Sequence, residues 1–417
     1  MRLIMIAAIL AAGRGKRMRP LTETRLKGSL PFHNKPLLLW LVEQLLSSGV
    51  VSRVVLVITP WQEAAMRSLF ASTAFSADVL FTVQDPPKGT ADAVAQVEPF
   101  VASDQRQLLV LNGDILADLP AVLPRLFVQQ TALHAKAVLA VFPGTGSRYG
   151  LLQLAADGTV LSIKEKQQLA AIATESGYIN AGIYLFDRAI FDAIRQTPLS
   201  ERGEYELTDA ITLLGKEGPI GATIIDAWMS LENPLDLLKA QSYFKATVED
   251  ELRCMQFHSG GEIGFKAADE LFFDAETTIE FSSITIRGPV LLGKGTVVEP
   301  GAILGPAVFL GKDCTLGAGV KLAHCLLLDG CRLEAGCTVR NLVAGEEVLI
   351  GAQTKIGPPI PPTADAARAP LDPPSQLEEL VLIGAKSVIG SKMTLPQGTK
   401  LSAYAVHTRD LKEEPPD

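Results

Sequence analysis

The sequence predicts an α/β half with a mostly parallel sheet, followed by a solenoid of short parallel strands. Residues 1 to about 240 alternate apolar, β-rich runs with helix-like stretches. Strands separated by helices of this size imply a sheet with helices on both faces. After about residue 262, aliphatic residues recur every six positions instead. A fixed short period sustained over this length indicates a solenoid, in which each strand stacks on its equivalent one coil away.

Residue patterns place the elements of the first half. We assign residues 1–240 to one domain and 241–262 to a helical linker, within a helix-like stretch at 235–253. The predicted strands are the apolar runs 3–9, 54–59, 107–111 and 136–142, and the predicted helices are 36–46 and 90–100. The first run is short and leads directly into a glycine motif, so we interpret it as a buried strand and not as the core of a signal peptide.

The six-residue period defines the second domain, 263–417. The repeat positions in register are Ile286, Leu292, Val298, Leu304, Leu310, Leu316, Leu322 and Leu328, and most precede a small or acidic residue. The register slips by one residue at 333–336 and resumes at Val339. Residues 358–375 carry seven prolines and are expected to form a loop excursion. These hexads resemble the left-handed parallel β-helix of hexapeptide-repeat proteins.

Composition and charge exclude several classes of protein. The 417 residues are 47% hydrophobic and 20% charged, as in a soluble globular protein with large cores. The net charge of −8 argues against non-specific nucleic-acid binding. The sequence has no run of roughly 18 uninterrupted apolar residues, the length that a membrane-spanning helix needs. Five cysteines, an odd number, favour a reducing cytoplasm.

A glycine-rich basic loop follows the first predicted strand. Residues 10–22 read LAAGRGKRMRPLT, with glycines at 13 and 15 and four cations. Glycine lets backbone N–H groups approach a phosphate closely, and the cations supply the charge that holds it. The spacing is neither that of an ATPase P-loop nor that of a dinucleotide fingerprint. The loop therefore indicates a nucleotide site at the carboxyl edge of an α/β sheet.

This loop, with Lys27 and the Asn-Lys-Pro-Leu run at 34–37, resembles the signature of sugar-1-phosphate nucleotidyltransferases. The chain departs at Lys16, where threonine is usual, and at Leu26, where proline often precedes the lysine. The resemblance implies a Rossmann-like mixed sheet that binds a nucleoside triphosphate. It assigns the nucleotide to Leu10, Ala12, Gly13 and Gly15, and catalytic contacts with the triphosphate to Arg17 and Lys27.

Asp114 follows an apolar strand and Gly113, a position that exposes a carboxylate at the sheet edge. Nucleotidyl transfer needs Mg²⁺ on phosphate oxygens, and carboxylates are its usual protein ligands. The resemblance makes Asp114 the metal ligand and a catalytic residue. An Asx turn after a strand is the alternative reading of the same residue.

Residues 84–93 resemble the family's base-recognition segment. A glutamine amide at Gln84 offers a donor and an acceptor to a pyrimidine imide edge, and Gly89 lets the base lie against backbone. Gln84 therefore favours UTP or dTTP over GTP. Thr90 joins the nucleotide site in this resemblance, and we also expect its hydroxyl to cap the helix that follows.

A third set of residues matches the family's sugar-binding segments in order and spacing. The resemblance places Gly150, Glu165 and Asn180 on the sugar hydroxyls or N-acyl group, and Lys166 on the sugar phosphate. The segment 203–210 also resembles a family segment, and we expect it to be structural.

The chain departs from the family after Trp228. An aspartate or asparagine that contributes to the metal site is usual two residues later, where this chain has Ser230. A serine hydroxyl is a much poorer Mg²⁺ ligand than a carboxylate. Asp226 or Glu232 could substitute, phosphates and water could hold the metal, or catalysis could be weakened.

The solenoid contains two further candidate features. Cys325, Cys331 and Cys337 are spaced by six, which could gather three thiols at a metal, but cysteine also packs well as a small core residue, and we expect packing. Some hexapeptide-repeat proteins are acyltransferases with a histidine base. We expect His324 to be an ordinary coil residue.

The function predicted from these features is nucleotidyl transfer that forms a UDP- or dTDP-sugar from the triphosphate and a hexose or N-acetylhexosamine 1-phosphate, with Mg²⁺ as cofactor. The partners are those two substrates, with no nucleic acid and no membrane. The alternatives are a bifunctional uridylyltransferase and acetyltransferase, and a non-catalytic regulatory subunit. Because related β-helices commonly associate through a coil face, we expect a homotrimer or another homo-oligomer.

Overall fold

A computed structural model describes residues 5–145, 151–164, 176–243, 271–273, 276–279, 283–360 and 373–408. The chain forms two compact units. One contains Met1–Arg14 and Leu37–Ser230, and the other contains Gly15–Pro36 and Leu231–Asp417. The signature segment, defined here as Gly15–Pro36, therefore belongs to the same unit as the second half of the chain.

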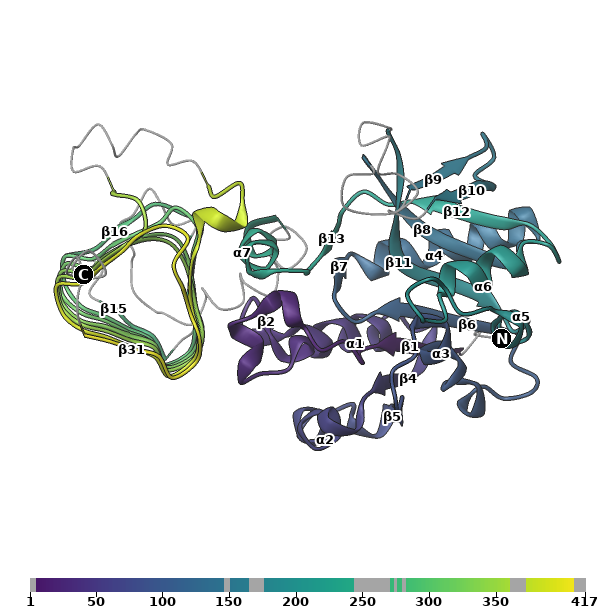
Figure 1. Ribbon diagram of the computed structural model, residues 1–417, viewed down its shortest axis with the longest axis horizontal. Helices are drawn as coiled ribbons and strands as arrows, with labels where there is room; N and C mark the ends of the chain where they lie inside the picture. Colours follow the sequence, from purple (N-terminus) through teal and green to yellow (C-terminus); the bar gives the residue numbers. More distant parts are fainter. Residues whose placement is uncertain are drawn as a thin grey trace. The chain divides into compact units, whose positions relative to one another are not determined.

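The first unit is built on a mixed sheet with the strand order β10-β9-β11-β6-β1-β4-β5, to which β8 and β12 are joined through β11 (Figure 1). The strands β1, β4, β5 and β6 are parallel neighbours, and β11 runs antiparallel to β6, β8 and β9. The strand bounds are β1 Met5–Leu10, β4 Val51–Ile58, β5 Val79–Val83, β6 Gln107–Asn112, β8 Ala137–Thr145, β9 Leu151–Leu154, β10 Val160–Lys164, β11 Ser176–Asp187 and β12 Ile220–Ile224. This sheet confirms the predicted α/β architecture.

Helices cover both faces of that sheet. The helices are α1 Leu37–Ser47, α2 Glu63–Ala71, α3 Thr90–Ala95, α4 Leu119–Leu133, α5 Ile190–Gln196 and α6 Leu207–Leu214. On one face α3, α5 and α6 share a core with Ala8, Val55 and Val110. Outside that core, α1 lies against β4, and α4 lies against β8 and β12. The helix predicted at 90–100 ends at Ala95, because Pro99 lies in a separate 3₁₀ turn, Glu98–Phe100. Within the part of the chain that the structure describes, no helix is long and apolar enough to cross a membrane.

The second unit contains the predicted solenoid, whose coils are triangular when viewed end-on in Figure 1. Every pair of coil strands that the structure describes is parallel, as stacking of equivalent strands requires. The strands are β14 Leu271–Phe273, β15 Thr278–Ile279, β16 Thr285–Ile286, β17 Val290–Leu292, β18 Val297–Val298, β19 Ile303–Leu304, β20 Val308–Leu310, β21 Thr315–Leu316, β22 Lys321–Leu327, β23 Arg332–Leu333, β24 Thr338–Ala344, β25 Leu349–Ile350, β26 Lys355–Ile356, β27 Val381–Ile383, β28 Val388–Ile389, β29 Thr394–Leu395, β30 Lys400–Leu401 and β31 Val406–His407. These coils are those expected of a left-handed β-helix.

The register slip lies earlier than predicted. Leu322 and Leu327 both enter the core, so the inward spacing is five residues there, and Leu328 is not part of the core cluster. His324 makes this possible because it adopts a left-handed conformation, φ 51°, at the corner between them. Asn341 does the same one coil later. Farther on, Ile356 pairs directly with Leu395, so the coil closes across the proline-rich excursion. Residues 361–372 of that excursion lie outside the described residues.

The solenoid cysteines are core residues. Cys325, Cys331 and Cys337 are fully buried in the coil interior together with Cys314. Burial raises the pKa of the Cys325 thiol to about 12, so the thiol is protonated at neutral pH. Among the described residues, no three histidine, cysteine, aspartate or glutamate side chains gather as metal ligands would. The cysteines therefore fill space, as expected.

The helix α7, Pro234–Tyr243, joins the signature segment to the coils of the second unit. It contacts β22 and β24 on one side and the strand β2, Pro31–Phe32, on the other. With β3, Lys35–Pro36, the strand β2 forms a hairpin whose two turn residues, His33 and Asn34, both have positive φ. The backbone N–H of His33 donates to Gln241 Oε1, and its Nε2 lies 2.7 Å from the Gln241 carbonyl oxygen. Residues 244–270, which include the predicted linker, are not described.

The burial of His33 gives stability a specific pH dependence. Burial lowers the pKa of His33 to about 4 from its usual 6.5, because removal from water disfavours the charged imidazolium more than the hydrogen bond to the Gln241 backbone favours it. Between these values the unfolded chain binds a proton that the folded chain does not. The contribution of His33 to the free energy of unfolding is therefore complete above pH 6.5 and falls by roughly 3 kcal/mol as the pH drops to 4.

Denaturant unfolding from pH 7 to pH 4 checks this prediction. His33→Asn, which tolerates the left-handed turn, is expected to remove about that much of the pH dependence. The exposed His134, also at positive φ, provides the control His134→Asn, which should follow the wild-type profile. A His33→Asn profile parallel to that of the wild type would contradict the assignment.

Candidate active site

The first residues of the predicted nucleotide loop and the predicted metal ligand both follow strands at the carboxyl edge of the sheet in the first unit. The parallel strands β1 and β6 pair up to Leu10 and Asn112, their last residues. Beyond them the Gly113 N–H donates to the Leu10 carbonyl oxygen at 2.9 Å. A Cβ at Gly113 would lie 2.8 Å from that oxygen, so only glycine permits this approach. The approach brings Gly113, the residue before Asp114, against Leu10 and Ala11.

Asp114 is half-buried at this edge and precedes a short strand, β7 Ile115–Ala117. Mg²⁺ is usually bound by one or two carboxylates, several waters and the substrate phosphates. One carboxylate next to a loop of glycine and backbone N–H groups therefore suits a metal that arrives with a triphosphate. The described residues provide no enclosed cage of acidic ligands.

Ser230 lies opposite the residue after Asp114. The strand β13, Trp228–Ser230, pairs antiparallel with β7, and Ser230 faces Ile115 in that pairing. The position where the family usually has an aspartate or asparagine is thus beside the predicted metal ligand, and it carries a hydroxyl. Asp226, one proposed substitute, is 90% exposed and pairs with Arg125 at 2.8 Å.

Asn180 belongs to an irregular part of β11 that lies against the same edge. Its Oδ1 accepts the Gly182 N–H at 3.1 Å, and the pairing with β8 shifts register after Asn180. Gly182 has φ 73°, and a Cβ there would lie 2.5 Å from Asn112 Nδ2. Trp228 Nε1 donates to the Ala181 carbonyl oxygen and fixes the bulge. The amide of Asn180 is therefore held next to the end of β6. Gly150, Glu165 and Lys166 lie outside the described residues.

Gln84 has a structural task that limits its predicted role. It is 2% exposed, and Nε2 donates to the Gly89 carbonyl oxygen at 2.9 Å and to Asp92 Oδ2 at 2.7 Å. Both amide hydrogens are thus used within the protein. A base can take only the amide oxygen as an acceptor, so the expected pairing through both donor and acceptor is not available.

Thr90 caps a different helix from the one expected. Gly89 occupies the N-cap position of α3 with φ 113°, so Thr90 lies inside the helix and makes no cap to it. Its hydroxyl instead accepts the Leu207 N–H, at 3.0 Å, where α6 begins. Tyr205 donates to the Lys88 carbonyl oxygen and accepts from the Ala91 N–H. The segment 203–210 therefore has the structural role predicted for it, since it clamps the loop that contains Lys88.

Gly89→Ala is expected to destabilise the first unit. The added Cβ would meet the Tyr205 carbonyl oxygen at 2.5 Å, in a backbone conformation that alanine rarely adopts. Strain of this kind costs about 2–3 kcal/mol. Thermal melting should fall by roughly 5–10 °C. A Cβ at Gly13 meets nothing within 4 Å, so Gly13→Ala is the matched control and should keep the wild-type melting temperature. Equal melting temperatures for Gly89→Ala and Gly13→Ala would show that the close packing of Gly89 against Tyr205 does not stabilise the unit.

The two predicted phosphate cations belong to the second unit. Arg17 lies in the 3₁₀ turn Lys16–Met18, is 72% exposed, and its Nη1 is 2.5 Å from Glu232 Oε2. Glu232, a proposed substitute metal ligand, thus has a guanidinium partner. Lys27 begins the 3₁₀ turn Lys27–Ser29 and is half-buried. A Cβ at Gly15, which has φ 63°, would lie 3.1 Å from Lys27 Cβ, so the missing side chain at Gly15 leaves room for Lys27. That these cations join Asp114 in one site remains a prediction.

Comparison with protein families shows to which family the chain belongs. Residues 6–248, more than half of the chain, match the family model described as nucleotidyl transferase. The chain belongs to the nucleotidyl transferase family. Residues 286–406 of this nucleotidyl transferase match a second model, described as the GMPPB C-terminal domain. Members of the family generally use a divalent metal.

Individual relatives agree with this assignment. The bifunctional protein GlmU of Methanocaldococcus jannaschii is 30% identical over 250 residues, which cover 60% of this chain and 56% of that protein. Glucose-1-phosphate thymidylyltransferase of an Actinoplanes species is 32% identical, covering 59% and 80%. A bifunctional sugar-1-phosphate nucleotidylyltransferase/acetyltransferase of Sulfurisphaera tokodaii is 29% identical, covering 57% and 55%. The matches span about half the length of the bifunctional relatives.

Several residues that shape the site were not among the predicted ones. Asn112 packs against Gly182, Asp92 holds Gln84, and Tyr205 clamps Gly89. Asn112 and Asp92 lie within motifs that the sequence analysis used, and each is a polar residue next to a required glycine or glutamine. Tyr205 lies in the segment 203–210, which is expected to be structural, but its partner is not predictable because the contact joins segments more than one hundred residues apart.

Proposed function

We propose that this chain is a cytoplasmic sugar-1-phosphate nucleotidyltransferase that forms a nucleoside-diphosphate sugar and pyrophosphate. The observation that carries the proposal is the hydrogen bond from Gly113 to Leu10, which joins the residue before Asp114 to the end of β1 at the carboxyl ends of β1 and β6. Ligands of α/β sheets bind at this edge. Family membership supplies the reaction class.

In the proposed reaction an oxygen of the sugar 1-phosphate attacks the α-phosphorus of the triphosphate. A new phosphorus–oxygen bond forms as the bond to the β-phosphate breaks, and pyrophosphate leaves. Gly13 and Gly15 allow close backbone approach to the phosphates. Arg17 and Lys27 hold the triphosphate and stabilise the charge that develops on it. Positioning and charge neutralisation therefore account for the catalysis.

The sugar side of the site is proposed from the family resemblance and from Asn180. The Asn180 amide, held by the Asx turn to Gly182, would hydrogen-bond the sugar. Gly150 and Glu165 would complete that contact, and Lys166 would orient the attacking phosphate. Asp114 would hold Mg²⁺, which neutralises phosphate charge when it is bound.

The choice of base rests on Gln84. Its free acceptor, the amide oxygen, complements the N3–H of uracil or thymine and also the N1–H of guanine. UTP and dTTP remain the proposed substrates. Pyrophosphate release from GTP must be measured beside them, because guanine could make the same hydrogen bond.

A substrate screen tests the proposed function. Purified protein is incubated with Mg²⁺, one of UTP, dTTP, GTP, ATP or CTP, and a hexose or N-acetylhexosamine 1-phosphate, with pyrophosphate release as the readout. We expect release with UTP or dTTP, and we expect omission of Mg²⁺ to abolish it. Release with GTP alone would overturn the base assignment, and no release from any pair would support the non-catalytic alternative.

Acetyl transfer is the second candidate activity, because two relatives are named as bifunctional. The position of His324 argues against it here, since the side chain is 5% exposed at a coil corner and leaves little room for a base to meet a substrate. Addition of acetyl-CoA and glucosamine 1-phosphate to the same assay should release no CoA thiol. Thiol release that His324→Ala abolishes would establish the bifunctional alternative.

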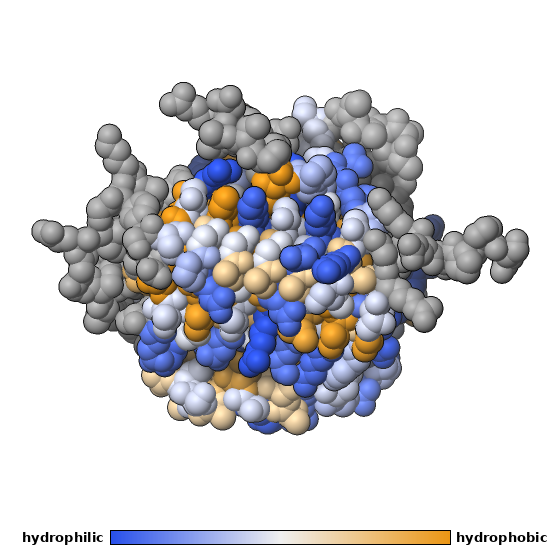
Figure 2. Space-filling model, turned by 90° about the vertical axis from the view of Figure 1, so that its left-hand side faces the viewer, coloured by the Kyte–Doolittle hydropathy of each residue, from blue (hydrophilic) through white to orange (hydrophobic). Residues whose placement is uncertain are grey.

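We also propose that the protein is a homotrimer that associates through a coil face. One outward row of the coils contains three valines that are each at least 36% exposed. In order along the stack, the row is Val297, Thr315, Arg332, Leu349, Val388 and Val406. Figure 2 shows apolar side chains among hydrophilic ones on one outer side of the coils. Light scattering at micromolar concentration should give three times the 44.6 kDa chain mass. A monomer under these conditions would contradict the proposal.

A further inference from the structure

We propose that the β-helix holds the signature segment in the conformation that binds the triphosphate, with Arg25 and Glu346 as the positioning residues. The inference rests on the proposed function, because it assigns the phosphates to Arg17 and Lys27. It adds a role for the coils that is neither acetyl transfer nor assembly.

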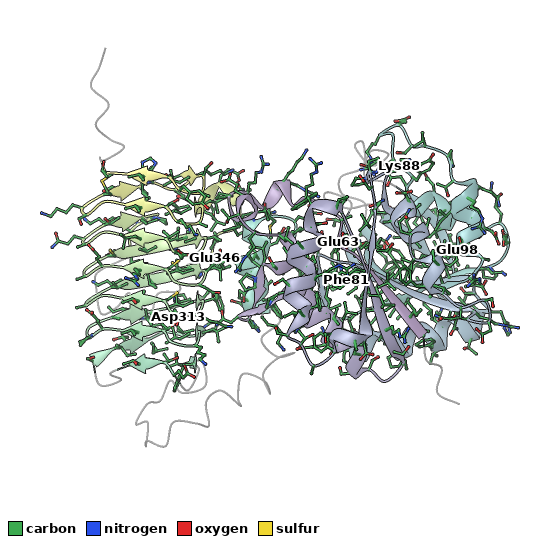
Figure 3. All side chains as sticks on the ribbon, turned by 90° about the horizontal axis from the view of Figure 1, so that it is seen from below. Glu63, Phe81, Lys88, Glu98, Asp313 and Glu346 are labelled. Carbon is green, nitrogen blue, oxygen red and sulfur yellow. The ribbon has the colours of Figure 1, made fainter. Side chains whose placement is uncertain are left out.

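The principal contact is an ion pair between Arg25 Nη2 and Glu346 Oε1, two residues that are each 22% exposed. Arg25 lies two residues before Lys27. Glu346 lies in the turn between β24 and β25, part-way along the coil stack (Figure 3). Its carbonyl oxygen accepts the Lys386 N–H of the next coil at 2.7 Å. The carboxylate is thus carried by a rigid element and shielded from most of the solvent.

Two further hydrogen bonds tie the same segment to other coils. Glu23 Oε2 accepts the backbone N–H of Ala403 at 2.7 Å. Asn34 Nδ2 donates to the Leu310 carbonyl oxygen at 3.1 Å. Together with Glu346, these partners lie on three coils well separated along the stack. The segment is therefore held at several points along its length, on both sides of Lys27.

The segment needs such support because it has little regular structure of its own. Between Gly15 and the hairpin at His33 it consists of three short 3₁₀ turns. The backbone hydrogen bonds within these turns each span three residues, and the bond from Thr22 Oγ1 to the Gly15 carbonyl oxygen, at 2.7 Å, spans seven. A segment of this kind samples several conformations unless tertiary contacts restrict it. Loss of the ion pair lowers the fraction of molecules in the binding conformation, and apparent affinity falls by the same factor.

The two adjacent glutamates Glu346 and Glu347 allow a matched test. Glu346→Gln removes the charge that faces Arg25. Glu347→Gln removes an equal charge in the same turn, where Glu347 is 62% exposed and lies 3.8 Å from Lys386. For Glu346→Gln we expect the KM for the nucleoside triphosphate to rise roughly tenfold, with the KM for the sugar 1-phosphate and the melting temperature close to those of Glu347→Gln. Equal triphosphate KM values for the two variants would overturn the inference.

A double-mutant cycle and hydrogen exchange complete the test. Arg25→Gln should raise the triphosphate KM as Glu346→Gln does, and the double variant should add little to either. Amide exchange of residues 15–36 should be faster in Glu346→Gln than in Glu347→Gln, a readout that needs no substrate. If the wild-type protein transfers no nucleotide, the proposed function fails while the exchange comparison still decides whether the coils hold the segment. Unchanged exchange in Glu346→Gln would refute the positioning role.

Discussion

Asp114→Asn is expected to lower kcat by about three orders of magnitude and to leave the fold intact. The carboxylate is the proposed protein ligand of Mg²⁺, and a bound metal ion contributes several kcal/mol of charge stabilisation in the transition state. About 4 kcal/mol corresponds to a thousandfold change in rate. Asparagine has nearly the same shape as aspartate, so packing at the end of β6 should be preserved. Steady-state pyrophosphate release and thermal melting measure the two quantities.

Asp118 provides a matched control for this variant. It lies four residues farther on, and its Oδ1 accepts the Ala121 N–H at 3.2 Å as the N-cap of α4. Asp118→Asn removes the same charge nearby and should keep both activity and most of the stability, because asparagine also caps helices well. Near wild-type turnover in Asp114→Asn would show that Asp114 is not the ligand of Mg²⁺. Equal loss of activity in both variants would point to a general effect of charge.

The sequence predicts most of the fold because the signals that set it are local and periodic. Buried parallel strands are continuous apolar runs, and β4, β6 and β8 lie where such runs occur. The hexad period is equally local, since each inward aliphatic stacks on its equivalent one coil away. The slip at His324 escapes this reasoning, because a left-handed corner residue shortens the repeat without changing the apolar pattern around it.

Parts of the site escape prediction because they depend on contacts between distant segments. The sequence predicts that Gln84 and Gly89 bind the base, and the structure adds that the Gln84 amide closes the loop through Asp92. Threonine is a common N-cap residue, but the N-cap of α3 is Gly89, with its positive φ, so Thr90 is already inside the helix. Its hydroxyl accepts the N–H of Leu207, where α6 begins. In both cases a backbone conformation and a remote partner decide the role of the residue.

The grouping of the signature segment with the β-helix is a further feature that a motif cannot show. The motif is contiguous with β1, so the sequence suggests that the loop and the sheet form one domain. The structure instead gives its charged residues Arg17, Glu23 and Arg25 partners at Glu232, Ala403 and Glu346. Ion pairs between residues hundreds of positions apart leave no periodic trace in one sequence.

Lys27→Ala is expected to lower kcat/KM by about 30- to 900-fold, which corresponds to roughly 2–4 kcal/mol of transition-state stabilisation. The ammonium group is proposed to contact the triphosphate, whose charge grows on the leaving pyrophosphate. The loss of kcat/KM in Arg17→Ala should fall in the same range, although this variant also leaves Glu232 without the guanidinium that lies 2.5 Å away. Lys16→Ala is the control, because Lys16 is exposed in the same loop and the family usually has threonine there.

The packing of Lys27 separates its chemical role from a structural one. The Lys27 atom nearest to where a Cβ at Gly15 would lie is Cβ, at 3.1 Å, and alanine retains that atom. The backbone of the 3₁₀ turn, with the Leu30 N–H donating to the Lys27 carbonyl oxygen, is likewise unchanged. Lys27→Ala should therefore melt within about a degree of Lys16→Ala while losing far more activity. If melting temperature and activity fall together in Lys27→Ala alone, the side chain stabilises the loop and does not bind phosphate.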